Sequence, residues 1–209
     1  MGDVANPASW PFPVLLHTVR GATARQIVDG DDTTLDVFVE GCRALASQGA
    51  AGVITSCGFL ATQQHAMARA SPIPVATSAL LLLPLIARCL PRNQRVGVIT
   101  YDADALTPAH FRAAGADPGT PAAGLPKGRA FHGMIEHGGA YDPAELEAEV
   151  LETAARLLQT QPDIGAFLLE CTNLPPFSAA LRRHTGLQVH DILTLGTWFH
   201  AGLTERPPA

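Results

Sequence analysis

Two distant segments of this chain share one layout, and this duplication constrains the fold more than any other feature of the sequence. An apolar run over residues 52–56 ends at Cys57, and a second apolar run over residues 166–170 ends at Cys171. A helical pattern follows each cysteine. Each cysteine is therefore predicted to lie at the carboxyl end of a strand, and the two are 114 residues apart.

The elements around the two cysteines repeat with the same spacing. The next apolar run contains a valine 18 residues after the cysteine in both halves, Val75 in the first and Val189 in the second. A predicted helix precedes each cysteine strand, over residues 34–48 and 143–160. Two copies of one folding unit usually pack about a pseudo-twofold axis, which would place the two thiols on opposite walls of a cleft.

Short apolar runs alternate with helical patterns along the chain, which predicts an α/β fold. The runs have no polar face, as is typical of parallel strands covered by helices on both sides. Asp142 is a predicted N-cap, and Gly186 is predicted to end a later helix. Residues 115–139 are predicted to form a long loop with a short strand near residues 130–134. The main predicted strands are residues 14–19, 52–56, 74–78, 95–101, 166–170 and 188–193.

The positions of both cysteines favour reactive thiols. Ligands of open α/β sheets bind beyond the carboxyl ends of the strands. The start of a helix at this place offers free N–H groups and a dipole that favours an anion, which predicts a lowered thiol pKa at Cys57 and Cys171. The N–H groups of Gly58, Thr172 and Asn173 are candidates to hold a carboxylate or a developing enolate.

Other polar residues near predicted strands are candidates with two readings each. Thr100 and Tyr101 end the run over residues 95–101, and they either line the site or cap a helix. Arg20 either binds a substrate carboxylate or is a solvated surface residue. His190 either approaches the cleft or is a buried histidine with satisfied partners.

Composition argues against several classes of function. Charged residues make up 16% of the chain and the net charge is −5, without a basic patch, so no nucleic-acid partner is expected. The single lysine, Lys127, stands in a Gly/Pro-rich stretch that is a poor host for a pyridoxal Schiff base. His132 and His137 do not share a helix face, so no metal site is expected.

The sequence also predicts where the protein works. The first residues lack a basic segment followed by an apolar one, so no secretion signal is expected. The longest apolar run, residues 79–90, is interrupted by Pro84 and Arg88 and is too short to span a bilayer. Four cysteines without such a signal are expected as reduced thiols, which predicts a cytoplasmic protein with no membrane partner.

The segments around the two cysteines resemble a known family. TSCGF at residues 55–59 and ECTNLPP at residues 170–176 are similar to the two cysteine motifs of the Asp/Glu/hydantoin racemase superfamily. The resemblance implies two pseudosymmetric, Rossmann-like α/β lobes with mostly parallel sheets and an active site in the interlobe cleft. We expect the first lobe to comprise residues 1–93 and 195–209, and the second lobe residues 94–194.

The resemblance also implies a chemistry without metal or organic cofactor. One thiolate of the pair Cys57 and Cys171 removes a proton from a carbon next to a carboxylate, and the opposite thiol supplies one. The leading hypothesis is a racemase or epimerase of an amino acid, a hydantoin or a related small acid, assembled as a homodimer or a higher homo-oligomer. The substrate-binding residues expected beside the cysteines are Ser56, Gly58, Thr172, Asn173, Thr100, Tyr101 and Asp191.

Two other classes of function stay open. The same scaffold supports a decarboxylase, a cis–trans isomerase or a lyase, including lyases that act on dimethylsulfoniopropionate. A protein that kept the fold but lost the chemistry would bind a small acid without converting it.

Four features bear on how closely this chain follows the family pattern. Gly58 stands where amino-acid racemases of the family usually carry asparagine, and Asn173 stands where glutamate racemases commonly carry histidine. The carboxylate of Glu170 opposes thiolate formation at Cys171 if it turns toward the sulfur, and has no such effect if it points away. The usual first strand of the family is expected to be missing or truncated, because the chain opens on a loop-like segment.

Overall fold

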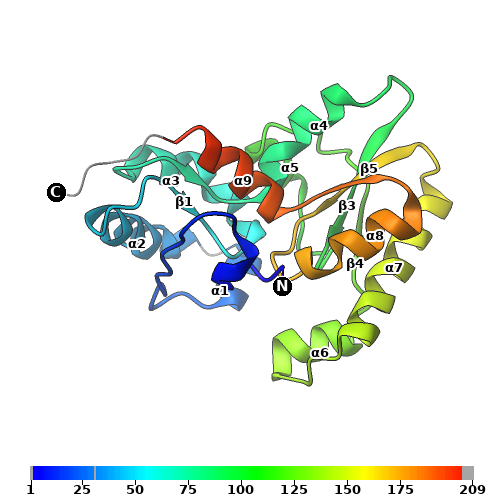
Figure 1. The fold of residues 1–209 in the computed structure, drawn as a ribbon, viewed down its shortest axis with the longest axis horizontal. Helices are drawn as coiled ribbons and strands as arrows, with labels where there is room; N and C mark the ends of the chain where they lie inside the picture. The colour runs from blue at the N-terminus through cyan, green and yellow to red at the C-terminus, as the bar shows by residue number, and fades with distance from the viewer. Residues whose placement is uncertain (1, 31, 204–209) are drawn as a thin grey trace.

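The protein has an α/β fold with two parallel sheets, seen here in a computed structural model that describes residues 2–30 and 32–203 (Figure 1). The first sheet pairs β1 with β2, and the second sheet has the strand order β4-β3-β5-β6. Residues 204–209, which the sequence assigns to the first lobe, lie outside the described residues, as do Met1 and Asp31. The strands are β1 Val53–Ile54, β2 Val75–Ala76, β3 Arg95–Thr100, β4 Ala122–Gly124, β5 Ile164–Leu169 and β6 Gln188–His190.

The register of the strands confirms the duplication. Val53 pairs with Val75 in the first sheet, and Phe167 pairs with Val189 in the second. In both cases the residue four positions before the cysteine pairs with the valine 18 positions after it. The repeated spacing between cysteine and valine therefore corresponds to one strand pairing that occurs twice.

Helices connect the strands, and one predicted helix start and one predicted helix end are confirmed. The side chain of Asp142 accepts hydrogen bonds from the N–H groups of Ala144 and Glu145, and Gly186 ends a helix with a φ of 70°. The α-helices are α1 Ala24–Val28, α2 Leu35–Ser47, α3 Gln64–Ala70, α4 Leu83–Cys89, α5 Pro108–Ala113, α6 Ala130–His137, α7 Pro143–Thr160, α8 Ser178–Thr185 and α9 Ile192–Ala201. The 3₁₀ helices are η1 Pro7–Ser9, η2 Asp32–Thr34, η3 Gly58–Gln63, η4 Ala79–Leu82 and η5 Pro175–Phe177.

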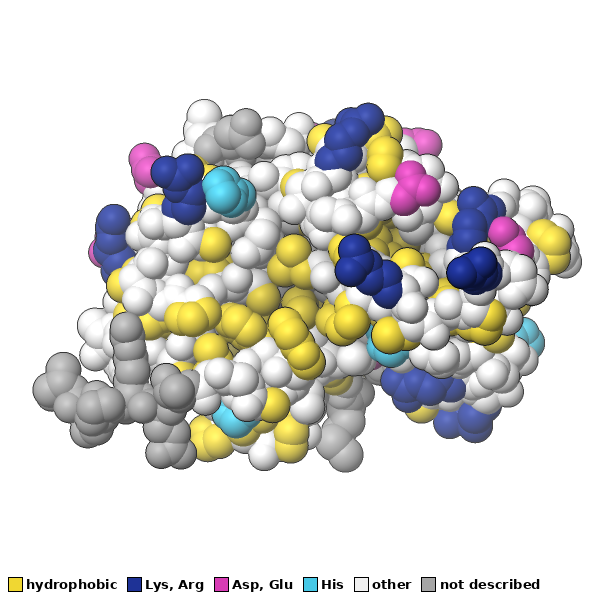
Figure 2. Space-filling model, turned by 90° about the horizontal axis from the view of Figure 1, so that it is seen from above, with side chains coloured by type: hydrophobic (Ala, Val, Ile, Leu, Met, Phe, Trp, Pro, Cys, Tyr) yellow, Lys and Arg dark blue, Asp and Glu magenta, His cyan; other side chains and the backbone are white. Residues whose placement is uncertain are grey.

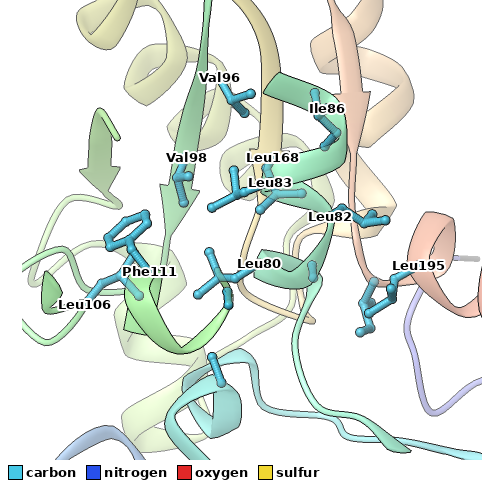
Figure 3. Close-up of a cluster of buried hydrophobic side chains, with 14 of the residues drawn as sticks. Leu80, Leu82, Leu83, Ile86, Val96, Val98, Leu106, Phe111, Leu168 and Leu195 are labelled. Carbon is cyan, nitrogen blue, oxygen red and sulfur yellow. The ribbon is translucent and has the colours of Figure 1, made fainter. Parts of the chain in front are cut away.

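Helices cover both faces of the four-stranded sheet, as the continuous apolar strands predict. On one face, Val98 of β3 and Leu168 of β5 pack against Leu80 and Leu83 of η4 and α4 (Figure 3). On the other face, residues of β3 and β5 pack against α7 and α8. The strands thus send alternate side chains into two apolar layers.

The chain returns to the first sheet at its C-terminal helix. A Cβ on Gly196 of α9 would lie 2.3 Å from the ring of Trp10, and a Cβ on Gly52 would lie 3.0 Å from Phe199. Both glycines are needed for this close approach. η4 and α4 precede residue 93, which the sequence assigns to the first lobe, but they pack on the four-stranded sheet. The boundaries of the two lobes stay a prediction.

The predicted strand at residues 14–19 is wrong. This segment has no regular secondary structure and forms no ladder with β1. His17 and Val19 pack instead against Gly41 of α2, and a cavity of about 910 Å³ lies between the segment, β1 and α2. In the described part of the chain, no strand precedes β1.

Two further predictions are corrected between β3 and β6. Residues 130–134 are helical rather than a strand, and the short strand of this region is β4. The buried carboxylate of Glu149 accepts hydrogen bonds from the N–H groups of Ala130 (2.8 Å) and Phe131 (3.2 Å), and so stabilises the start of α6. The predicted strand over residues 188–193 ends at His190, because Asp191 is the N-cap of α9.

The molecular surface bears on possible partners. Figure 2 shows one face on which apolar side chains gather across the middle while many Lys and Arg side chains lie to either side. Trp198 of α9 is among the exposed large apolar side chains. A homodimer stays a prediction.

None of the described helices is both long and apolar enough to cross a bilayer.

Replacement of Leu168 by alanine tests the packing of the central strand. Leu168 is fully buried, and its loss leaves a cavity that should destabilise the fold by about 2–5 kcal/mol. Leu16→Ala is the matched control, because Leu16 is 64% exposed and its truncation should change stability by less than about 0.5 kcal/mol. Urea unfolding of both variants measures this difference. Equal losses would contradict the assignment of the core.

Candidate active site

The two cysteines occupy equivalent turns after equivalent strands. Cys57 follows β1 and is the N-cap of η3, and Cys171 follows β5 in the turn before η5. In each turn the N–H three residues further on donates to the carbonyl of the cysteine, from Leu60 at 3.2 Å and from Leu174 at 3.0 Å. Both cysteines are free thiols. The duplicated sequence therefore produces a duplicated backbone turn that carries one thiol in each half.

The two cysteine turns contact each other directly. The hydroxyl of Thr172, which is 3% exposed, donates to the carbonyl of Ser56 at 2.6 Å. A Cβ on Gly58 would lie 2.5 Å from the carbonyl oxygen of Glu170. The charge of one thiolate also acts on the other thiol, since Cys57 raises the pKa of Cys171. The structure thus brings the thiols, Ser56, Gly58 and Thr172 into one place.

Glu170 turns into this site. Its side chain is fully buried, and the hydroxyl of Thr100 donates to its Oε2 at 2.7 Å. The other oxygen, Oε1, has no hydrogen-bond partner among the described residues. Burial raises the pKa of Glu170 to about 7, although the bond from Thr100 acts in the opposite direction. The orientation that the sequence leaves open is therefore the inward one.

The contact with Glu170 explains the glycine at position 58. A Cβ on Gly58 would lie 2.1 Å from Oε1 of Glu170, closer than any non-bonded contact allows. The space that a side chain at position 58 would need is filled by the carboxyl group. An asparagine cannot stand here beside the present Glu170, so Gly58 and the inward orientation of Glu170 belong to one local arrangement.

The predicted lowering of the thiol pKa values is wrong in sign. Burial raises the pKa of Cys57 and that of Cys171 to about 12, and the charge of Glu170 is the second cause in both. Backbone N–H groups act in the lowering direction at both thiols, and the side-chain amide of Asn173 adds a bond to Cys171 Sγ at 3.8 Å. The N–H groups are placed as predicted, but desolvation outweighs them.

A polar cluster adjoins Cys171. The hydroxyl of Tyr101 donates to Glu136, and the ring of His132 stacks on Tyr101 with the centroids 4.2 Å apart. Burial raises the pKa of Tyr101, and the charge of Cys171 is among the smaller causes. Sequence reasoning missed His132 and Glu136, one helical turn apart on α6, because it weighed this segment only as a zinc motif. Their four-residue spacing is the signal that identifies a shared helix face.

Asp191 is not placed with the cysteines. Its carboxylate caps α9 by accepting from the N–H of Thr194 at 2.8 Å, and the hydroxyl of Ser178 donates to its other oxygen at 2.6 Å. It lines a groove beside Trp198, separate from the cavity that Cys57 lines. Thr100 is also fully buried and engaged with Glu170. Arg20 is exposed and His190 is half-buried.

The surroundings of Cys57 are largely apolar. Ser56 and Cys57 line the cavity of about 910 Å³ together with residues of β1, α2 and α9 and the irregular segment at residues 12–19. Among the described residues, neither Lys nor Arg lines this cavity. The described residues also contain no group of three or more His, Cys, Asp or Glu side chains placed to hold a metal ion.

Fold and site together define an α/β protein with parallel sheets, in which two cysteine turns and the buried carboxyl group of Glu170 meet. The model of the Asp/Glu/hydantoin racemase family matches residues 14–199, and the chain belongs to this family.

Known relatives differ in the reaction they catalyse. The chain is 28% identical to dimethylsulfoniopropionate lyase 7 of Emiliania huxleyi over 99% of its length, and to a dimethylsulfoniopropionate lyase of Durusdinium sp. clade D over 99%. It spans 64% and 71% of these relatives' own lengths. The Gly74Cys mutant of arylmalonate decarboxylase has a similar fold, with a TM-score of 0.66, 21% identity and coverage of 97% of this chain and 90% of that one.

Gly58→Ala tests the contact between the two cysteine turns. The new methyl group would overlap with Glu170, so we expect a loss of about 1–3 kcal/mol in the free energy of unfolding. Gly133→Ala on α6 is the matched control, since no atom lies within 4 Å of the place its methyl group would take and alanine favours a helix. Urea unfolding decides. An unchanged stability of Gly58→Ala would disprove the contact.

The pH dependence of stability tests the buried carboxyl group. The folded-state pKa of Glu170 is raised from 4.5 to about 7, so the folded state binds more protons than the unfolded state between these values. The contribution of Glu170 to stability is therefore complete below pH 4.5 and declines as the pH rises through 7, by about 3 kcal/mol in total. Glu170→Gln removes this titration while other groups cancel in the comparison. The stability of the parent protein relative to Glu170→Gln should fall between pH 4.5 and 8, and a constant difference would refute the assignment.

Proposed function

We propose that this protein is a cofactor-independent lyase that cleaves dimethylsulfoniopropionate or a closely similar β-substituted carboxylate. The observation that carries the proposal is the meeting of two thiols at one buried site in a chain that matches dimethylsulfoniopropionate lyases over nearly its whole length. Removal of a proton next to the carboxylate is the step that this lyase chemistry shares with the family's racemases.

The proposed reaction is a β-elimination. The thiolate of Cys57 or Cys171 takes the proton from the carbon next to the carboxylate. The electron pair of that C–H bond forms the carbon–carbon double bond, and the electrons of the β carbon–sulfur bond leave with the sulfur. The products are acrylate and dimethyl sulfide, and the proton stays on the cysteine until the site is reset.

The charges of the site support a substrate with a positive pole. Dimethylsulfoniopropionate carries a sulfonium cation and a carboxylate, so its net charge is zero. A buried carboxyl group and a cavity without Lys or Arg among the described residues suit such a zwitterion better than a dicarboxylate.

A racemase or epimerase is the second candidate, and the symmetry of the two cysteine turns favours it. Racemisation needs an acid and a base on opposite faces of the reacting carbon, whereas elimination needs one base. The duplicated turns at Cys57 and Cys171 supply both groups.

Product analysis separates the two functions. We expect the protein to release dimethyl sulfide and acrylate from dimethylsulfoniopropionate, followed by headspace gas chromatography and proton NMR. Cys57→Ala and Cys171→Ala should identify the base, whose loss should lower the rate about 100-fold or more. Cys89→Ala is the control, because Cys89 is an exposed cysteine at the end of α4 and does not line the cavity beside Cys57.

Exchange in deuterated water covers the alternative. A racemase would incorporate deuterium next to the carboxylate of an amino acid or hydantoin without releasing gas. Absence of both products from dimethylsulfoniopropionate, together with such exchange, would overturn the lyase in favour of the racemase. Absence of turnover and of exchange would leave a binding protein.

A further inference from the structure

Glu170 is a buried acid that the family chemistry of two thiols does not require. It precedes Cys171 directly, and its Oε1 fills the space above Gly58, the residue that follows Cys57. This oxygen is buried and has no hydrogen-bond partner in the described part of the chain. A buried carboxyl oxygen without a hydrogen-bond partner lowers the stability of the fold. Its position between two thiol-bearing turns therefore calls for a functional explanation.

We propose that Glu170 is a positioning residue that governs both thiols by holding the negative charge of the site, so that Cys57 or Cys171 ionises only when the Glu170 carboxyl carries a proton. The proposal rests on the proposed function insofar as these two thiols are the proton-transfer groups. It adds a third acid that makes their ionisation interdependent.

The position of the Glu170 carboxyl group against both cysteine turns carries this inference, and the electrostatic surroundings support it. The charge of Glu170 acts on Cys57 and on Cys171, and it is the second cause of the raised thiol pKa in both. No cationic side chain of the described residues contributes to the pKa shift of Glu170 or that of Cys57. A second negative charge in the same buried volume therefore lacks a counter-ion, and the three acids titrate as one coupled group.

Every neighbouring element contributes in a definable way. β3 supplies the hydroxyl of Thr100, which stabilises the charged form of Glu170. The residue after it, Tyr101, interacts with Cys171 and is hydrogen-bonded to Glu136 of α6. His132 of α6 bonds to the same Glu136 at 3.2 Å. The carboxylate of Glu136 is thus hydrogen-bonded by both Tyr101 and His132. Oε1 of Glu170, in contrast, has no hydrogen-bond partner among the described residues.

The proton balance of the step is simple. One cysteine thiol loses its proton and becomes the thiolate, and the Glu170 carboxylate gains a proton and becomes neutral, so the site keeps one negative charge throughout. The structure shows no hydrogen bond between Glu170 and either sulfur. The proton therefore moves through solvent or substrate rather than along a direct bond, and the inference concerns the charge that Glu170 holds.

Thiol reactivity as a function of pH tests the proposal without any substrate. The protein is treated with a pyridyl disulfide, which reacts with thiolates over a wide pH range, and each modified cysteine is quantified by peptide mass spectrometry. Exposed Cys89 is the internal reference for the reagent. In Glu170→Gln, we expect both site thiols to react at least tenfold faster than in the parent protein at pH 8, which corresponds to a thiol pKa lower by about one unit.

The same ratio at pH 5 separates charge from structure. Glu170 is protonated there in the parent protein, so the variant and the parent should react at equal rates. A loosened structure would instead raise the rate at both pH values, and would overturn the proposal. Unchanged or slower reaction at pH 8 would overturn it as well.

A second pair of variants keeps the test decisive if Glu170→Gln does not fold. Thr100→Val removes the hydrogen bond that stabilises the charged carboxylate, which raises the pKa of Glu170. More Glu170 is then neutral at pH 7, and both thiols should react faster. Thr100→Ser keeps the hydroxyl and should match the parent protein. Equal rates in Thr100→Val and Thr100→Ser would contradict the proposal, and a lack of lyase activity would not affect this readout.

Discussion

The direct contact between the two cysteine turns is the constraint on which the site depends. Thr172 bonds to the carbonyl of Ser56, and Glu170 occupies the space beside Gly58. These contacts join segments that lie more than a hundred residues apart. Glu170 and Cys171 are buried beside these contacts, and desolvation raises the pKa of the carboxyl group and of both thiols. Acid strength in this site follows from how tightly the turns pack.

Much of the fold is predictable because the duplication encodes a strand register. The interval from each cysteine to its valine, Val75 or Val189, reappears as one pairing in each sheet. Local composition is a weaker guide, since residues 14–19 have the apolar character of a strand but find no partner there. The start of α6 depends on Glu149, a cap supplied from another helix, which no local pattern reveals.

The site was predictable in position but not in acidity. The sequence identifies Cys57 and Cys171 through their place at strand ends, and the structure brings them together. Free N–H groups after each strand predict a lowered thiol pKa. Desolvation depends on how the whole molecule packs, and it raises the pKa of both thiols instead. For the same reason the direction of Glu170 could not be settled from alternation along the strand alone. Asp191 matched a family pattern, yet its hydrogen bonds are those of a helix cap.

A site that tolerates one negative charge has different consequences for the two candidate reactions. Racemisation leaves the charge of the substrate unchanged, so repulsion from Glu170 is equal before and after the reaction. Elimination from a sulfonium carboxylate begins with a substrate of zero net charge and ends with an anion and a neutral sulfide. Once the cysteine has taken the substrate proton, Glu170 loses its own proton again, and its charge then repels acrylate more than it repels the neutral substrate, which favours release of acrylate. The buried carboxyl group thus offers an advantage to the elimination that racemisation does not share.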